Sequence, residues 1–241
     1  MNKKCIMLSG LPSTGKTNSL RNLPLEKILY INTDGKSELD FEMQNKFGKF
    51  ITPEDPLQII ASLQAFEDSN YEIIVVDSLS FWFEQIESMH IINSDDSRAM
   101  WGKYAQWGKE LLNFARLKSK KTWIFMIHTN EETGSKKKGM VKGSLSKLGL
   151  ESFFGVVLET YTYDLAKPNI YGSVIGYGFQ TKPTLENRNT NARSPIGLFP
   201  TIIKNNDLDL VLRRLDGEKI DWDNEEVLFE KDKKLAKELG L

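Results

Sequence analysis

The chain has 241 residues, of which 40% are hydrophobic and 27% charged, and its formal net charge is -1. This composition indicates a globular protein with one substantial core. A protein with nearly zero net charge is not attracted to nucleic acid as a whole, so any such attraction must come from local basic patches. The single cysteine, Cys5, excludes an internal disulfide. With no apolar run of about 18 residues and no signal-peptide pattern, we expect a soluble, cytoplasmic protein without a membrane partner.

Apolar runs of strand length recur along the first half of the chain, separated by stretches long enough for crossover helices. These runs are Cys5 to Leu8, Ile28 to Ile31, Ile73 to Val76 and Trp123 to Ile127. Between the third and fourth runs, apolar side chains recur at spacings of three and four from Met100 to Lys118, which predicts a helix. The alternation predicts an α/β domain with a mostly parallel central sheet and helices on both faces.

The second half of the chain is less regular. The glycine- and lysine-rich segment from Thr129 to Lys147 predicts a long mobile loop. Further strands are expected at Phe153 to Leu158 and at Ser173 to Thr181, and an amphipathic helix is expected from Leu208 to Leu215. The charged tail from Asp221 is expected to end as a surface helix. We therefore divide the chain into a core of residues 1–204 and a short helical extension of residues 205–241.

The first predicted strand is followed by a phosphate-binding loop, because Gly10 to Thr17 fits the pattern G-x-x-x-x-G-K-[ST]. Small residues let backbone N–H groups converge on phosphates, and Lys16 supplies a positive charge for the β- and γ-phosphates. Thr17 offers a hydroxyl to Mg²⁺. The alternative is a glycine-rich turn with no ligand. The residues expected to contact a nucleoside triphosphate are Gly10, Pro12, Ser13, Thr14, Gly15, Lys16, Thr17 and Asn18.

A carboxylate at the end of the third strand predicts the second half of a magnesium site. Asp77 follows the buried run Ile73 to Val76, and a carboxylate there can hold Mg²⁺ through water. An Asp that caps the next helix is the competing interpretation, with Ser78 as another possible cap. Ser78 also stands where many mechanical ATPases carry a water-activating glutamate, and a serine hydroxyl is no base at neutral pH.

Two further polar residues end strands at the same edge of the sheet, where ligands of open parallel sheets bind. Asp34 follows the second strand and is the favoured water activator, although an Asp-Gly turn explains it as well. His128 ends the fourth strand, where a neutral imidazole can touch the γ-phosphate or the attacking water. A structural histidine at a strand end is the alternative.

Taken together, these motifs resemble the RecA-like ATPase core over about residues 3 to 202. They resemble more closely the phage nucleotide-binding proteins described as single-strand annealing or recombination ATPases. The resemblance implies ATP and Mg²⁺ as cofactors, and the host cytoplasm as the location for a phage-encoded protein. In that family the Asp34 position is usually glutamate, so the shorter side chain is a departure. The His128 position is commonly a glutamine that senses the γ-phosphate.

In the same family the loop after the sensor lies along single-stranded DNA in a ring or filament, so the resemblance implies DNA binding and a homo-oligomer. The lysines expected to meet DNA phosphates are Lys136, Lys137, Lys138, Lys142 and Lys147. A solvated basic loop is the alternative. RecA-like sites are usually completed by a basic residue from a neighbouring subunit. Arg193 is the first choice for that role, ahead of Lys182 and Arg188.

Other functions remain open. A P-loop kinase uses the same phosphate loop but needs a lid with arginines, and Thr129 to Lys147 contains none. A GTPase is disfavoured because Asn45-Lys46-Phe47-Gly48 lacks the final Asp of the guanine-reading motif. A nucleotide-gated DNA-binding loader with little hydrolysis stays possible because of the Asp34 departure.

Overall fold

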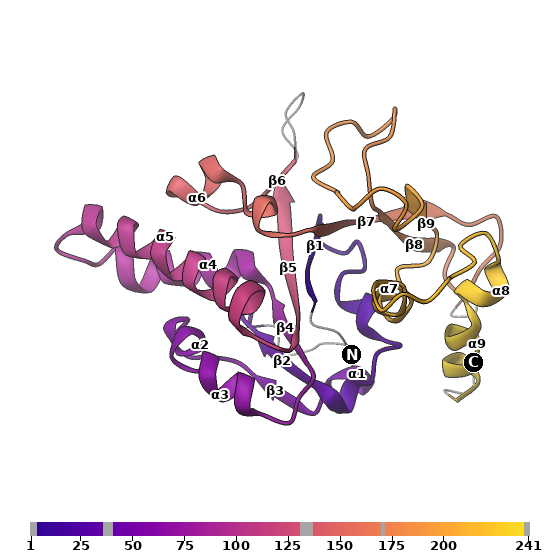
Figure 1. Ribbon diagram of the computed structural model, residues 1–241, viewed down its shortest axis with the longest axis horizontal. Coiled ribbons are helices and arrows are strands. Elements are labelled where there is room, and N and C mark those ends of the chain that lie inside the picture. The colour runs from indigo at the N-terminus through magenta and orange to yellow at the C-terminus, as the bar shows by residue number, and fades with distance from the viewer. Residues whose placement is uncertain (1–3, 36–40, 131–136, 170–171, 239–241) are drawn as a thin grey trace.

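The fold is seen in a computed structural model that describes residues 4–35, 41–130, 137–169 and 172–238. The strands are β1 (Cys5–Gly10), β2 (Ile28–Asn32), β3 (Lys49–Ile51), β4 (Ile73–Asp77), β5 (Thr122–Asn130), β6 (Lys138–Gly139), β7 (Val156–Asp164), β8 (Ile175–Gln180) and β9 (Ile202–Ile203). The α-helices are α1 (Phe41–Gln44), α2 (Leu57–Ala61), α3 (Leu63–Asp68), α4 (Leu79–Ile86), α5 (Ser97–Asn113), α6 (Gly143–Leu148), α7 (Leu208–Leu215), α8 (Glu225–Leu228) and α9 (Glu230–Glu238). Figure 1 shows the strands between two groups of helices.

The strand order across the described part of the sheet is β3-β2-β4-β5-β1-β7-β8-β9, and β6 pairs with β5. Every pair from β3 to β7 is parallel, whereas the β7–β8 and β8–β9 pairs are antiparallel. The carboxyl ends of β1, β2, β4 and β5 therefore meet at one edge. The predicted α/β fold with a mostly parallel sheet, as expected for a RecA-like P-loop NTPase core, is confirmed.

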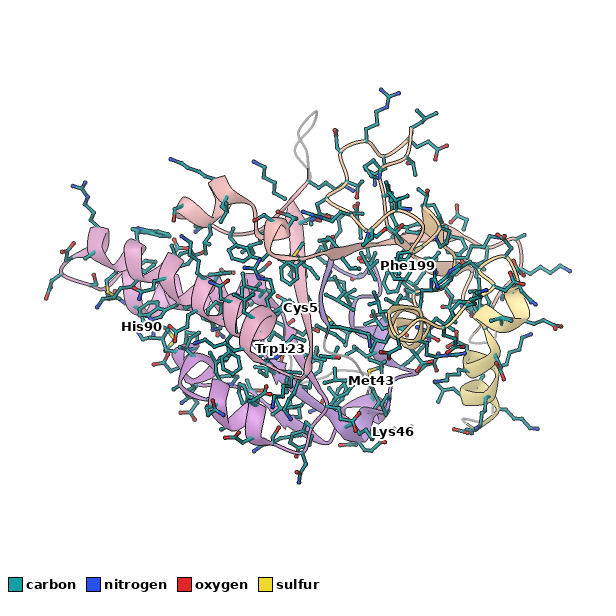
Figure 2. All side chains as sticks on the ribbon, in the orientation of Figure 1. Cys5, Met43, Lys46, His90, Trp123 and Phe199 are labelled. Atoms are coloured by element: carbon teal, nitrogen blue, oxygen red, sulfur yellow. The ribbon has the colours of Figure 1, made fainter. Side chains whose placement is uncertain are left out.

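The sheet separates two apolar cores, because successive side chains of a strand point to opposite faces. One core joins Met7, Val76 and Trp123 to α2, α3, α4 and α5. The other joins Leu8, Val75 and Met126 to the segment after the phosphate loop and to α7. In Figure 2, Trp123 lies on the side of α5 and Phe199 on the side of α7. Helices thus cover both faces, as predicted.

The connection that follows the phosphate loop is shorter than we expected. Thr17 opens a 3-10 helix of four residues, Thr17–Leu20, in place of a crossover α-helix. A second 3-10 turn, Leu25–Lys27, leads directly into β2. Pro24 prevents a longer helix from running through this connection, since proline disfavours helical geometry at the residue before it and has no N–H to continue a helix. The phosphate loop therefore has only a short helical turn behind it.

Two boundaries also differ from those predicted in the second half. The segment predicted as one long loop contains β6 and α6, and Leu145 of α6 is fully buried against the core of α4 and α5. Phe153 ends a 3-10 turn, Leu150–Phe153, and the strand β7 begins only at Val156. The strand expected from Ser173 to Thr181 is β8, which pairs antiparallel with β7, and the helices expected near the C-terminus are α7 and α9. In the described residues, no helix is long and apolar enough to cross a membrane.

Candidate functional site: the phosphate loop and the strand ends around it

The phosphate loop forms a tight turn between β1 and the 3-10 helix Thr17–Leu20. Ser13 and Gly15 have φ values of 62° and 86°, in the left-handed region that an extended or helical chain does not use. Thr14 Oγ1 lies 2.7 Å from the carbonyl oxygen of Leu11 and 2.6 Å from Thr160 Oγ1 of β7. Leu11, Pro12 and Ser13 remain exposed. The turn is therefore fixed from inside the protein while its outer rim faces solvent.

Lys16 is folded back across this loop. Its ammonium group donates hydrogen bonds to the carbonyl oxygens of Gly10, at 3.0 Å, and Leu11, at 2.7 Å, and the residue is 6% exposed. A positive charge is thus held at the centre of the loop by main-chain oxygens. These neutral oxygens are weaker partners for an ammonium group than phosphate oxygens are.

The two predicted magnesium residues lie in direct contact, although 60 positions separate them. Thr17 Oγ1 donates to Asp77 Oδ2 at 2.8 Å. The hydroxyl of Tyr30, from the neighbouring strand β2, donates to the same carboxylate oxygen. Ser78, and not Asp77, is the N-cap of α4. Asp77 therefore does not cap α4. Its carboxylate instead joins the phosphate loop to β4.

Tyr30 is completely buried, and its ring stacks on those of Phe47 and Phe50. Burial, and then the nearby Asp77 carboxylate, raise the pKa of Tyr30 well above its usual value of 10, so its hydroxyl remains a donor at neutral pH. Asp34 comes two residues after Asn32, the β2 residue that pairs with Asp77, and its charge adds to the same shift. Asp34 itself is partly buried, just after Thr33, whose hydroxyl donates to the Ser78 carbonyl oxygen.

His128 lies on β5, between β4 and the strand β1 that leads into the phosphate loop. In the parallel pairing of β1 with β5 it is the partner of Gly10, and its ring contacts that of Phe81 edge to face. Its backbone N–H donates to Ser80 Oγ at 3.0 Å. His128 and Pro12 line the same pocket of about 410 Å³ between α4 and the segment after β5. The strand order β2-β4-β5-β1 therefore places Asp34 and His128 on the same side of β1, with His128 nearer to the loop.

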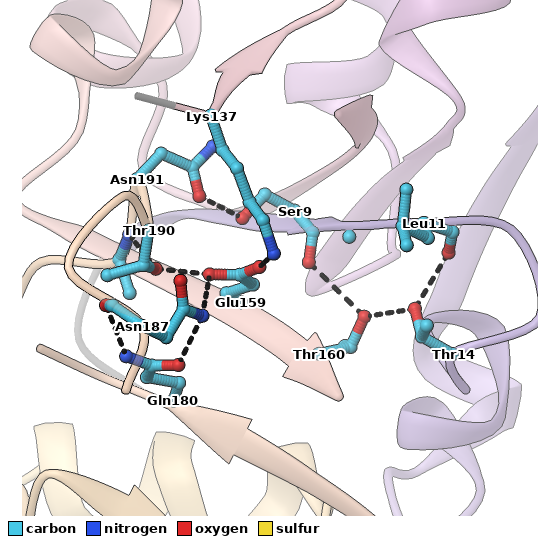
Figure 3. Close-up of polar contacts among 12 residues, drawn as sticks. Ser9, Leu11, Thr14, Lys137, Glu159, Thr160, Gln180, Asn187, Thr190 and Asn191 are labelled. Atoms are coloured by element: carbon cyan, nitrogen blue, oxygen red, sulfur yellow. Dashed lines mark hydrogen bonds and ion pairs between the residues drawn. The ribbon is translucent and has the colours of Figure 1, made fainter. Parts of the chain in front are cut away.

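A buried polar cluster supports the loop from β7, as Figure 3 shows. Thr160, which bonds to Thr14, follows Glu159, which is 4% exposed. Glu159 forms an ion pair with Lys137 at 2.6 Å and accepts a hydrogen bond from Thr190. The segment after β5 and the phosphate loop are therefore both held by adjacent residues of one strand.

The predicted DNA-contacting lysines fall into different environments. The side chain of Lys137 is 12% exposed, in the ion pair with Glu159, so its ammonium is engaged inside the protein. Lys142 forms an exposed ion pair with Glu87 at 2.7 Å. Lys138 and Lys147 are exposed. Lys136 lies outside the described residues.

Arg193 does not lie at the phosphate-loop edge. Its main chain pairs with Val157 of β7, through hydrogen bonds of 3.0 and 2.9 Å, and its side chain is exposed. Val157 is level with Met7 in β1, three residues before Gly10. Arg188 is exposed, and Lys182 donates to the carbonyl oxygen of Phe199. Within one chain, none of these three residues has a described contact with the loop.

The donor set fits a magnesium-bound nucleoside triphosphate. A central ammonium, a turn with left-handed residues and a hydroxyl–carboxylate pair are the groups that such a ligand requires. A second pocket, of about 1500 Å³, opens beside Asn18 and is lined in part by Tyr177 and Asn206. The phosphate loop therefore has open space on both sides, next to His128 and next to Asn18.

Sequence reasoning did not identify two residues of this region. In the sequence, Tyr30 looked like one more apolar position of a buried strand. Its role becomes visible only in the structure, where its hydroxyl donates to the Asp77 carboxylate. Asn206 donates to the carbonyl oxygen of Gly15 at 2.7 Å from 191 positions away. The run Asn205-Asn206-Asp207 just before an amphipathic helix was the available signal, and it was assigned to a separate extension.

Solved structures similar to this chain include a RadB recombinase and a KaiC-like protein, both at low sequence identity. A RadB recombinase crystal structure is 19% identical, with a TM-score of 0.45, and the match covers 78% of this chain and 90% of that one. A KaiC-like protein from the archaeon Pyrococcus horikoshii OT3 is 12% identical, with a TM-score of 0.47, and covers 78% of this chain and 82% of that one. With TM-scores below 0.5, neither likeness identifies the function of this chain. No curated protein matches its sequence.

A family comparison is more informative. The model of an AAA domain family matches residues 2–186, which include the phosphate loop, Asp77 and His128. Members of such families are P-loop NTPases, in agreement with the contact between Thr17 and Asp77. Because the match spans well over half of the sequence, the chain belongs to this AAA domain family.

Proposed function

We propose that this protein binds Mg-ATP at the phosphate loop, hydrolyses it, and acts on single-stranded DNA in recombination or strand annealing. The observation that supports the nucleotide site most strongly is the 2.8 Å contact between Thr17 Oγ1 and Asp77 Oδ2. This contact unites the two predicted halves of the site, one from the turn after the phosphate loop and the other from the end of β4.

Each residue has a distinct task in this proposal. The main-chain N–H groups of the loop and Lys16 hold the phosphates, and Lys16 exchanges its two carbonyl partners for phosphate oxygens. Thr17 and Asp77 hold Mg²⁺, with Tyr30 fixing the carboxylate. Bound Mg-ATP supplies the phosphoanhydride bond that is cleaved and the cation that neutralises its charge.

Asp34 orients and deprotonates the attacking water in this scheme, and His128, on the strand next to β1, contacts the γ-phosphate end. Their placement on the carboxyl edge, near Tyr30 and beside Gly10 respectively, supports these roles. A neighbouring copy in a homo-oligomer contributes Arg193, whose exposed side chain is available for contact between subunits.

The DNA contact rests on the exposed lysines of the segment after β5. Lys138, Lys142 and Lys147 remain candidates, because their side chains reach solvent on the flank of His128. Lys137 is engaged by Glu159 and is better suited to holding the start of this segment. Nucleotide at the loop and DNA on these lysines would then lie at the same, carboxyl end of β5.

One observation favours a second function. The pocket of about 410 Å³ beside Pro12 and His128 has aromatic walls and adjoins the phosphate loop, which suits the acceptor of a P-loop kinase. ATP turnover with and without single-stranded DNA separates the two functions. DNA-stimulated phosphate release supports the proposal. Phosphate transfer to a nucleoside monophosphate, without stimulation by DNA, would replace it with the kinase.

A further inference from the structure

The C-terminal part of the chain contacts the phosphate loop directly. Asn206 lies between β9 and α7, and its Nδ2 donates to the carbonyl oxygen of Gly15 at 2.7 Å. The approach is so close that a Cβ on Gly15 would come within 2.7 Å of both Asn206 Nδ2 and the ring of Tyr177. Gly15 immediately precedes Lys16, so this contact acts on the backbone that carries the central ammonium.

A second contact fixes the orientation of the Asn206 amide. Arg21 Nη1 donates to Asn206 Oδ1 at 2.9 Å. Because a guanidinium only donates, it requires the oxygen of the amide to face it. The nitrogen must then face Gly15, where it finds the carbonyl oxygen. Arg21 itself directly follows the 3-10 helix Thr17–Leu20.

The C-terminal helix holds Arg21 in turn. Asp232 of α9 accepts from Arg21 Nε at 2.6 Å and from Nη2 at 2.9 Å, in a two-bond fork. The Arg21 side chain is 9% exposed and that of Asp232 is 2% exposed. Asn205 joins the same network, accepting from Arg21 and donating to Asp232. An unbroken series of hydrogen bonds therefore runs from α9 to the carbonyl oxygen of Gly15.

We infer that Asn206 is a positioning residue for the phosphate loop and that docking of α9, through Asp232 and Arg21, sets its orientation. This inference rests on the proposed nucleotide site. Nucleotide affinity then depends on the C-terminal helix. Because coupling between two sites is reciprocal, bound nucleotide also tightens the docking of α9.

The test replaces the donor while keeping the acceptor. Asn206→Asp has the same shape and still accepts from Arg21, but it cannot donate to Gly15. We expect its Kd for Mg-ATP, measured by calorimetry, to rise roughly tenfold. Asp232→Asn, which weakens the hold on Arg21, should raise the Kd in the same direction by a smaller factor. Glu218→Gln is the matched control. It removes an exposed ion pair between Glu218, which follows α7, and Arg213, and the variant should bind Mg-ATP as the native chain does.

A second readout separates positioning from mere stability. Hydrogen exchange of the α9 amides in the native chain should slow when Mg-ATP saturates the protein. Unchanged exchange in α9, or native Kd values in folded Asn206→Asp and Asp232→Asn, would overturn the inference while leaving the nucleotide site intact. Failure of the native chain to bind Mg-ATP would instead remove the proposed function itself.

Discussion

At the scale of single residues, the site depends on a carboxylate that is held from two sides. Asp77 Oδ2 accepts from Thr17 in the phosphate loop and from Tyr30 in the neighbouring strand. Thr17 offers a hydroxyl that can pass to a metal ion, whereas Tyr30 is buried among aromatic rings and cannot leave. Tyr30 is therefore suited to keep the carboxylate in place while its other partners change.

Replacing Tyr30 with phenylalanine should expose this role. The ring stacking on Phe47 and Phe50 is retained, but one hydrogen bond to a charged group is lost, which should lower the free energy of unfolding by about 2 kcal/mol. We expect the Mg²⁺ concentration for half-maximal ATP turnover to rise severalfold, because Asp77 is less well oriented. An unchanged Mg²⁺ dependence would show that Tyr30 serves packing alone.

The raised pKa of Tyr30 also predicts a dependence of stability on pH. Above pH 10 the unfolded chain loses the tyrosine proton while the folded chain keeps it, so the free energy of unfolding falls as pH rises. One such group contributes a slope of up to about 1.4 kcal/mol per pH unit. Tyr104 and Tyr161, whose pKa values burial raises to about 12, contribute in the same direction.

Denaturant unfolding at several alkaline pH values isolates the share of Tyr30. The native chain should lose stability more steeply above pH 10 than the Tyr30→Phe variant does. Parallel pH profiles for the two proteins would contradict the burial of an ionisable hydroxyl beside Asp77.

At the scale of elements, the segment after β5 combines a fixed start with exposed lysines. Lys137 is largely covered and forms an ion pair with the buried Glu159, whereas its neighbour Lys138 is exposed. Lys137→Ala should lower the free energy of unfolding by about 3 kcal/mol, because it leaves the Glu159 charge buried without its cation. Lys138→Ala, the matched control, should unfold within about 0.5 kcal/mol of the native protein. Equal stability of the two variants in urea would refute this division of roles.

The exposed lysines carry the DNA prediction. Converting Lys138, Lys142 and Lys147 to alanine together should weaken binding of single-stranded DNA and lower the salt slope of its affinity by about 2, since each phosphate contact contributes about 0.7. Fluorescence anisotropy of a labelled oligonucleotide over a salt series measures both effects. A native protein with the same affinity at low and high salt would contradict the DNA role.

The elements also show where sequence reasoning reached its limit. Strands β1, β2, β4 and β5 were predicted because each is an uninterrupted apolar run buried on both faces. The segment from Thr129 to Lys147 looked unstructured because its composition is polar, yet Leu145 is fully buried against the core of α4 and α5 and holds α6 in place. Because a single buried leucine holds this helix to the core, the sequence has too few apolar residues there to show a helical pattern.

At the scale of the whole molecule, residues from the first and last parts of the sequence lie in contact at and just after the phosphate loop. The loop motif and Asp77 were predictable because the residues that identify each of them lie within a few positions of one another in the sequence. The contacts of Gly15 with Asn206 and of Arg21 with Asp232 span 191 and 211 positions. No local sequence pattern predicts contacts between residues so far apart in the chain. The proposed boundary between residues 204 and 205 cuts the chain just before this network.

The site also makes a prediction for the stability of the entire fold. A ligand that binds only the folded chain stabilises it, by about 2.7 kcal/mol at a concentration of 100 times the Kd. Saturating Mg-ATP should therefore raise the unfolding temperature of the native chain. A transition that stays in place at saturating Mg-ATP would argue against a folded-state site.

The most direct test of the nucleotide site is calorimetric titration of Mg-ATP into the native chain and into the Lys16→Ala variant. Lys16 donates to the carbonyl oxygens of Gly10 and Leu11 in its own loop, and we expect its replacement by alanine to leave the fold intact. We predict saturable binding to one site per chain in the native protein and a loss of at least about tenfold in affinity in the variant. Equal binding by both proteins, or no binding by the native chain, would contradict the account.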